Sequence, residues 1–477
     1  MLCDLGIACV LYAFARGQKL NRNQAGVLGL LAVFNPVLVL NSAAWGQVDS
    51  VLALLLMLVA LLAIRRKWIA LMPVYMLAVL VKPQALMLGF LGLAAIVMDW
   101  LRHKEDRKPM LIGTGVAVVL ALLVVLPFQG EQESGWLINL YAGTLSSYAY
   151  ATVNTANLYY LFGANWSAIE NTAAWGVCAI LAVISAGWGA WCFVTLRRCG
   201  RKAFWLEPVL MVAFTVFFLI CAISGSSWTV MGYGAMALAF AMVLPMFLRA
   251  GKMELLPLAG GLLFLLLYVL GIKMHERYLF PAVAFFLMAY AVKRDSKVLL
   301  LLLLTTATMF VNEGIVLDNS VRLGSSMGHL NNDTYVLNMI LSGLNLLAVP
   351  LGLWCAMDAF YLQRQEAEQE HAEKRLPLRR FEAQPRRLDT FHTDPSLHWK
   401  KLDTVLILAG TAIYALVAFW NLGSTKAPQS AWTTTTPEES VTIDLGRYYE
   451  DFSMLYYCGV SYADFYVETS DDGETWS

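Results

Sequence analysis

Three short polar segments interrupt the apolar runs of this chain, and each carries residue types that could do chemistry. The first is 41–50, where Trp45, Gln47 and Asp49 follow one another closely. A carboxylate can accept a proton, an amide can hydrogen-bond hydroxyl groups, and an indole offers an apolar plate for a sugar ring. If this segment is helical, Trp45 and Asp49 share one face. The alternative is an interfacial Trp anchor beside an Asp that caps a helix.

The second segment places Lys82, Pro83 and Gln84 at the end of an apolar run. A cation followed by a proline that can begin a helix is consistent with an anion site. We therefore count Lys82 and Gln84 as candidate substrate-binding residues. The alternative is a lysine that only snorkels to the membrane surface.

The third segment gathers Lys273, His275, Glu276 and Arg277 within five residues between two apolar runs. Lys273 and Arg277 could share a helix face at a spacing of four residues. Such a cluster suits a phosphate, because Arg supplies a bidentate fork and Lys a point charge. Glu276 would orient the cations. The alternative is a plain connecting loop.

The composition requires a lipid environment for these segments. Of the 477 residues, 59% are hydrophobic and 14% are charged, with a mean hydropathy of +0.60. Soluble globular chains usually carry about a quarter charged residues. The formal net charge is zero, so nothing favours nucleic acid as a partner. The eight cysteines are scattered without CxxC or zinc-ligand spacing, so no metal site is predicted, although a divalent metal stays possible as a cofactor.

Apolar runs that could cross a membrane, or nearly so, follow one another along the chain. Backbone polar groups in lipid must be satisfied within their own segment, so each run is expected to be a helix. The sequence thus predicts an all-α, multi-pass membrane protein with about fourteen transmembrane segments. They are 2–15, 25–41, 50–64, 68–81, 85–100, 110–127, 173–196, 205–222, 229–248, 255–272, 278–292, 297–312, 335–359 and 403–420.

Lysine and arginine alternate strongly between the two sides of this arrangement. The loops of one side hold 28 of the 34 basic residues, and the other side holds six. The positive-inside rule makes the basic side cytoplasmic, so all three polar segments are expected at the outer membrane boundary. Met1 would then also lie outside without a signal sequence, which leads us to expect at least one helix upstream of it.

The C-terminal part is predicted to contain three further units. Residues 361–402 are predicted to form a charged cytoplasmic linker. Residues 403–420 are predicted to form the final transmembrane helix, and residues 428–477 an extracellular β domain. Apolar and polar residues alternate in 441–445 and 465–469, and a turn signal follows. The motifs "IDLG" at 443–446 and "SDDGETW" at 470–476 resemble the first half of a discoidin (F5/8 type C, galactose-binding-like) β-sandwich. The alternative is a short hairpin.

The motifs "WGQVDS", "KPQ" and "KMHERYLFP" together resemble a bacterial branch of the GT-C superfamily of membrane glycosyltransferases, similar to mannosyltransferase-like proteins. The resemblance spans roughly residues 1 to 360. It implies inverting transfer of a hexose from a polyprenyl-phosphate donor to a glycan, lipid or protein acceptor at the outer face. By match of motif, His275 and Arg277, with Lys273, would hold the donor phosphate. Trp45, Gln47 and Asp49 would line the sugar or acceptor site.

The sequence departs from this family at one point. The catalytic aspartate of the family usually lies in a first external loop that has no counterpart here, and Asp4 does not match it. Asp49 is therefore the remaining candidate base, and we expect the chain as given to be inactive or nearly so. Two other functions stay open: a multi-pass transporter or lipid flippase with an extracellular carbohydrate-binding domain, and a membrane-anchored carbohydrate-binding protein.

Overall fold

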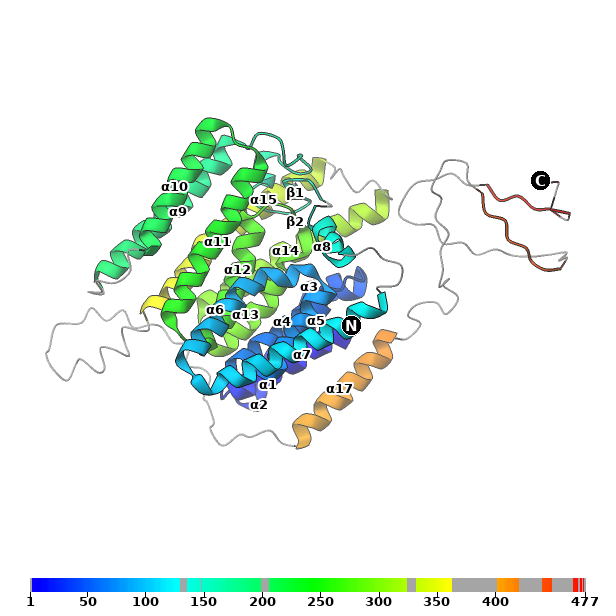
Figure 1. Ribbon diagram of the computed structural model, residues 1–477, viewed down its shortest axis with the longest axis horizontal. Helices are drawn as coiled ribbons and strands as arrows, with labels where there is room; N and C mark the ends of the chain where they lie inside the picture. Colours follow the sequence, from blue (N-terminus) through cyan, green and yellow to red (C-terminus); the bar gives the residue numbers. More distant parts are fainter. Residues whose placement is uncertain are drawn as a thin grey trace.

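The computed structural model shows a bundle of helices with very little sheet (Figure 1). It describes residues 2–128, 135–146, 148–198, 206–323, 332–362, 401–419, 440–447, 466–470, 472–473 and 475. Within these ranges, nine helices are long and apolar enough to cross a membrane. The chain is thus helical and of membrane-protein character, as predicted. The count of about fourteen spans stays a prediction, because several helices are shorter.

The helices follow the predicted apolar runs closely. The α-helices that cover them are α1 Leu2–Gly17, α2 Arg22–Val33, α4 Asp49–Ile64, α5 Trp68–Val81, α6 Leu86–Arg102, α7 Arg107–Val125, α9 Trp175–Arg198, α10 Leu206–Ser224, α11 Trp228–Ala250, α12 Leu256–Leu270, α13 Phe280–Lys293, α14 Ser296–Leu323, α15 Asn332–Ala356 and α17 Lys401–Phe419. One further helix, α8 Trp136–Ser146, was not predicted. In addition, α14 continues eleven residues past the predicted end at 312, so Glu313 lies inside a helix and not in a loop.

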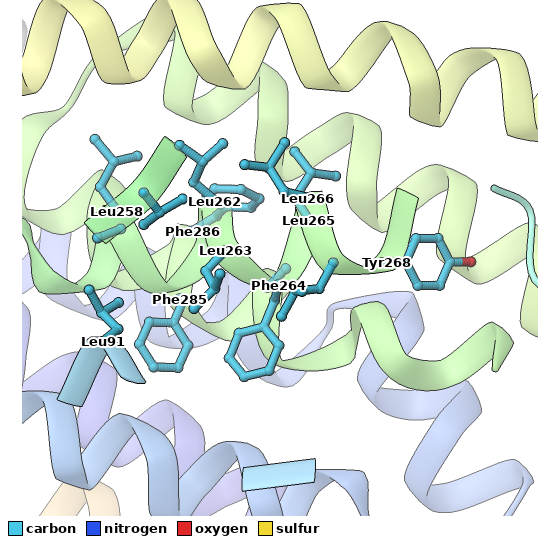
Figure 2. Packing of buried hydrophobic residues seen from close by; sticks show 14 of the residues in the cluster. Leu91, Leu258, Leu262, Leu263, Phe264, Leu265, Leu266, Tyr268, Phe285 and Phe286 are labelled. Atoms are coloured by element: carbon cyan, nitrogen blue, oxygen red, sulfur yellow. The ribbon is translucent and has the colours of Figure 1, made fainter. Parts of the chain in front are cut away.

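Helix α12 forms the centre of the bundle. All its residues from Leu256 to Leu270 are buried, and the neighbouring α13 is buried almost as completely. A helix that is apolar on every side is expected in such a position. Gly260 and Gly261 let α13 approach, since a Cβ on either would lie 2.6 or 2.8 Å from the ring of Phe285 or Phe286. Figure 2 shows these rings packed along α12.

The predicted run 25–41 is broken near its middle. Helix α2 ends before Phe34, and Asn35 caps a short new helix, α3 Pro36–Leu38, by accepting a hydrogen bond from Val37 N at 3.0 Å. The chain then widens into a π-helix, η1 Val39–Ala44. Such π-turns are rare, and they often occur at functional sites.

The strands of the described part are two very short ones, β1 Thr152–Val153 and β2 Met274–His275, which pair in parallel. They bring a loop that follows α8 onto the connection between α12 and α13. In Figure 1, β1, β2, α3 and α8 gather at the end of the bundle where α5 and α12 also end. We call this the site end, and the other the basic end.

The predicted C-terminal units are described only in small part. Linker 361–402 lies almost wholly outside the described residues, as does most of 428–477. The described residues 441–445 and 466–469 carry no assigned strand, and Tyr466 is 90% exposed. Gly473 does form the predicted turn, with φ +75° and its N–H bonded to Ser470 Oγ at 2.8 Å. The β-sandwich therefore stays a prediction.

Candidate functional site

The site end brings together five charged side chains from four different elements. Asp49 opens α4, Lys82 follows α5, Glu276 and Arg277 lie in the single-turn helix η7 Glu276–Leu279, and Glu313 comes from α14. Buried charges are costly in a low-dielectric interior, so they need partners there. The Lys82–Asp49 ion pair and the hydrogen bond from Gln84 to Tyr278 join the three predicted polar segments, although these are far apart in sequence.

Asp49 is held by two partners. Its side chain is fully buried, and Lys82 Nζ forms an ion pair with Oδ1. The other oxygen, Oδ2, accepts a hydrogen bond from Asn41 Nδ2 at 3.3 Å. The same amide nitrogen donates to Glu313 Oε1 at 3.0 Å. One asparagine of the π-helix thus joins two buried carboxylates from different helices.

The third predicted segment is compact and mostly buried. Arg277 Nη1 donates to Glu276 Oε1 at 2.8 Å, as expected for a glutamate that orients a cation. Burial raises the pKa of Glu276, against the opposing charge of Arg277. His275 Nδ1 lies 3.9 Å from Glu276 Oε2. Burial lowers the pKa of His275 to about 3, helped by the positive charges of Arg277 and Lys82. His275 is therefore neutral near pH 7 and could meet a phosphate only as an N–H donor.

Gln84 and Tyr278 close the cluster on one side. Gln84 Nε2 donates to the carbonyl of Tyr278 at 3.2 Å, and Lys82 Nζ lies 5.7 Å from the centre of the Tyr278 ring. The ammonium of Lys82 thus faces both a carboxylate and an aromatic ring. The second predicted segment is in this way tied to the third.

Several buried polar atoms around this cluster have no hydrogen-bond partner among the described residues. Buried polar groups are nearly always satisfied in native proteins, so each such atom needs an explanation. Around this cluster they belong to residues that touch or flank one another. They are Asn41 Oδ1, Ser50 Oγ, Gln84 Oε1, His275 Nε2, Arg277 Nε and Glu313 Oε2. A polar ligand bound at this place would satisfy them.

Two predicted site residues, Trp45 and Gln47, are half-buried, and among the described residues no side-chain hydrogen bond joins either of them to the cluster. Residues 45–48 are not helical, because Gly46 adopts a left-handed φ of +75°, so Trp45 and Asp49 do not share a helix face. Lys273 also has a left-handed φ, +57°, and is followed by a strand. The expectation that Lys273 and Arg277 share a helix face is therefore wrong.

Sequence reasoning missed two residues of the cluster, Asn41 and Glu313. Asn41 was noted only as the first residue of its segment. Glu313 was assigned to an external loop because the apolar run before it ends at Asn312. The signal that could have found it is the pair Asn312–Glu313 directly after 15 mainly apolar residues, since ionisable residues at the end of a membrane helix mark functional positions.

The structure also contains an apolar groove. It has a volume of about 360 Å³ and lies between the ends of α5 and α7 and the unpredicted helix α8. Tyr141 of α8 donates to the Val79 carbonyl of α5 at 2.9 Å, which fixes α8 against α5. The groove is lined by Leu80, Val124, Val125, Phe128, Trp136, Leu137, Leu140 and Tyr141. Leu80, which lines the groove, stands two residues before Lys82 in the sequence.

A different cluster lies at the basic end. The ligand atoms of Asp99, His103 and Asp106 lie within 4.8 Å of one another, the one such set among the described residues. However, Trp68 Nε1 donates to Asp99 Oδ2 at 3.0 Å, and Arg66 pairs with Asp106 Oδ2 at 2.6 Å. An arginine already occupies the position of a cation. We therefore do not assign a metal to this cluster, and the candidate site contains no comparable set.

Comparison with known proteins identifies no relative. No family model matches the chain, and no curated protein is detectably similar to it.

Proposed function

We propose that the site end transfers a hexose from a polyprenyl-phosphate donor to a glycan, lipid or protein acceptor. The observation that carries this proposal is the buried ion pair of Lys82 with Asp49, in a chain that also has an apolar groove lined by Leu80, two residues before Lys82. A polyprenyl-phosphate sugar is an apolar chain attached to a phosphate. A groove for the chain and a cation for the phosphate match both parts of such a molecule.

The buried carboxylates that pair with Lys82 and Arg277 support the proposal. Lys82 and Arg277 each pair with a buried carboxylate, so they are held at fixed positions within a low-dielectric region. A preorganised cation there stabilises a leaving phosphate more strongly than the same charge would in water. The unpartnered atoms Arg277 Nε and His275 Nε2 offer further hydrogen bonds to phosphate oxygens.

The carboxylates would serve the acceptor. In the proposed step, Asp49 takes the proton of an acceptor hydroxyl while that oxygen forms a bond to the anomeric carbon. The bond from this carbon to the phosphate oxygen breaks, and the phosphate leaves with the electron pair. Lys82 pairs with Asp49 in this structure, so a donor phosphate that draws Lys82 away would leave the carboxylate free to accept a hydrogen bond from the acceptor hydroxyl.

The uneven distribution of Lys and Arg indicates which side of the membrane the candidate site faces. The three polar segments belong to the side with six of the 34 Lys and Arg residues, which we propose faces outside. A discoidin-like domain at 428–477 would lie on the same side. Such a domain could hold the product glycan near the enzyme.

The test is transfer of a radiolabelled hexose from a synthetic polyprenyl phosphate, using the full-length protein, with any sequence that precedes Met1, in membranes. We expect Lys82→Met and Arg277→Gln to lower kcat by about 100-fold, because each removes a cation that stabilises the leaving group. Lys67→Met and Arg65→Gln remove matched exposed cations from the basic end and should have no effect. Equal losses in all four variants, or no wild-type transfer from a panel of hexose donors, would overturn the proposal.

One observation favours a second candidate, a transporter or lipid flippase. Glu313 is fully buried about ten residues inside the end of α14, and an ionisable residue inside a membrane helix often marks a transport path. The same assay distinguishes the two functions. Movement of labelled donor across the membrane without transfer of its sugar would support the flippase.

A further inference from the structure

An aromatic cluster lies beside the cationic site, on the loop that follows α8. It consists of Tyr148, Tyr150 and Trp166, and we call it the aromatic shelf. The ring of Tyr148 stands edge-on to His275, with centroids 4.4 Å apart and an angle of 84°. Tyr148 is 43% exposed although it touches a buried residue of the site. The shelf therefore reaches from the charged cluster towards the surface.

The loop that carries the shelf is fixed to the site by backbone hydrogen bonds. Lys273 N donates to the Ala151 carbonyl at 3.0 Å, and the register of β1 and β2 sets Val153 opposite His275. Thr155 Oγ1 donates to the Met274 carbonyl at 2.6 Å. Residues 148–155 and the third polar segment thus form one unit. The position of the shelf relative to His275 is set by these bonds.

Trp166 is held in an unusual conformation. Its backbone is left-handed, with φ +58°, and so is that of Asn154, with φ +51°. The indole Nε1 donates to Asn154 Oδ1 at 2.9 Å, and the ring stands 5.0 Å from Tyr150 at an angle of 66°. A non-glycine residue in this conformation is strained, and it persists where the surroundings over-determine it. A tryptophan that only anchors a loop in the membrane interface needs no such arrangement.

These features suit the binding of a sugar ring. One face of a pyranose presents C–H groups, which pack on the electron-rich face of an aromatic ring. The indole N–H is already bonded to Asn154, so the apolar face of the ring is what Trp166 offers to a ligand. Tyrosine hydroxyl groups can bond the hydroxyl groups of a sugar. Sites of this kind combine aromatic surface with a few polar groups.

We propose that the aromatic shelf binds a pyranose ring of the acceptor, so that the acceptor is a glycan or glycolipid and not a bare protein hydroxyl. This inference rests on the function proposed above for the neighbouring site. It adds the class of acceptor and three residues that bind it. The donor would occupy the groove and the cations, and the acceptor sugar would approach over Tyr148.

A binding experiment tests the shelf without requiring transfer. Saturation-transfer NMR is recorded on the full chain in nanodiscs, with mannobiose, cellobiose and galactobiose as probes. We expect wild-type protein to bind at least one of them, and Trp166→Leu and Tyr150→Leu to weaken that binding about tenfold. Trp175→Leu is the matched control, because Trp175 is 74% exposed at the start of α9. Absence of binding to all three probes, or equal weakening of binding by Trp175→Leu, would overturn the proposal that the aromatic shelf binds a sugar ring.

A kinetic experiment then connects the shelf to the reaction. With the bound disaccharide as acceptor, Trp166→Leu should raise the acceptor KM about tenfold and the donor KM much less. Trp166→Phe keeps an aromatic face and should recover most of the loss. If the protein binds a disaccharide but transfers no hexose, the proposed function is wrong, while sugar binding by the aromatic shelf is supported. If transfer occurs with an unchanged acceptor KM in Trp166→Leu, the proposed function is supported, while acceptor binding by the shelf is wrong.

Discussion

Asn41 donates a hydrogen bond to Glu313 at 3.0 Å, although 272 residues of sequence separate them. Asn41 can make this contact because the chain forms a π-helix at 39–44, and Glu313 because α14 continues beyond its apolar run. The same amide bonds Asp49 at 3.3 Å. The relative positions of α4 and α14 at the site end therefore depend on one side chain.

The first prediction concerns this side chain. Asn41→Ala removes the donor shared by two buried carboxylates, and it should lower the free energy of unfolding by about 2–3 kcal/mol. Thermal unfolding in detergent, followed by circular dichroism, measures the change. Asn139→Ala is the matched control, since Asn139 is exposed on α8. A melting temperature equal to wild type in Asn41→Ala would show that the two carboxylates do not need the amide.

The second prediction concerns the pH dependence due to His275. Its pKa is lowered in the folded chain to about 3, from 6.5. Below pH 6.5 the unfolded chain therefore binds a proton that the folded chain does not. The stability contributed by neutral His275 is fully present above pH 6.5 and is lost as pH falls towards 3, at up to about 1.4 kcal/mol per pH unit.

His275→Gln isolates this contribution, because glutamine keeps hydrogen-bonding groups but does not titrate in this range. We expect its stability to fall less steeply than that of wild type between pH 6.5 and 4. Parallel curves for His275→Gln and wild type would mean that folding does not lower the pKa of His275. Denaturant titrations at each pH give these curves.

The third prediction tests the packing of the bundle centre. Gly260→Ala would place a Cβ 2.6 Å from the ring of Phe285, which is itself fully buried and has little room to move. We expect a loss of about 1–3 kcal/mol, typical of an overpacked core. Gly92→Ala on α6 meets nothing within 4 Å and should be neutral or slightly stabilising. If both variants unfold at the same temperature, α12 and α13 are packed less closely than the structure shows.

The helices could be predicted from sequence because their cause is local. A long apolar run can satisfy its backbone in lipid only as a helix, so hydropathy alone locates the α-helices from α4 to α7 and from α9 to α13 within a few residues. The three polar segments were also placed together correctly, because the alternating basic loops fix the side on which each segment lies.

The details of the site depend on tertiary contacts and were not predictable in the same way. Nothing local shows that Gly46 takes a left-handed φ or that 39–44 widens into a π-helix. Charge states also follow from burial. The sequence places His275 within a group of cations, but its side chain is only 5% exposed in the structure, and this burial lowers its pKa. Helix α8 was missed because an apolar surface helix of 11 residues is too short to be identified as a span.

The fourth prediction concerns the loop that carries the aromatic shelf. Asn312 uses its whole side chain to hold this loop: Nδ2 donates to the Asn154 carbonyl at 2.9 Å and to Asn338 Oδ1 at 3.1 Å, while Oδ1 accepts from Ala156 N at 3.2 Å and Tyr268 Oη at 3.0 Å. Asn312→Ala leaves several of these buried groups unpaired. We expect the segment around Asn154 and Ala156 to open locally while the helices stay folded, because these two residues lose their hydrogen bonds to α14.

Hydrogen exchange followed by mass spectrometry detects this local opening. Amides of residues 151–158 should exchange about tenfold or more faster in Asn312→Ala, while those of α12 should not change. Asn171→Ala removes an exposed loop asparagine whose side chain donates to Ser167 Oγ within its own segment, and it should leave residues 151–158 protected. Faster exchange throughout α12 in Asn312→Ala would instead show that the asparagine supports the bundle as a whole.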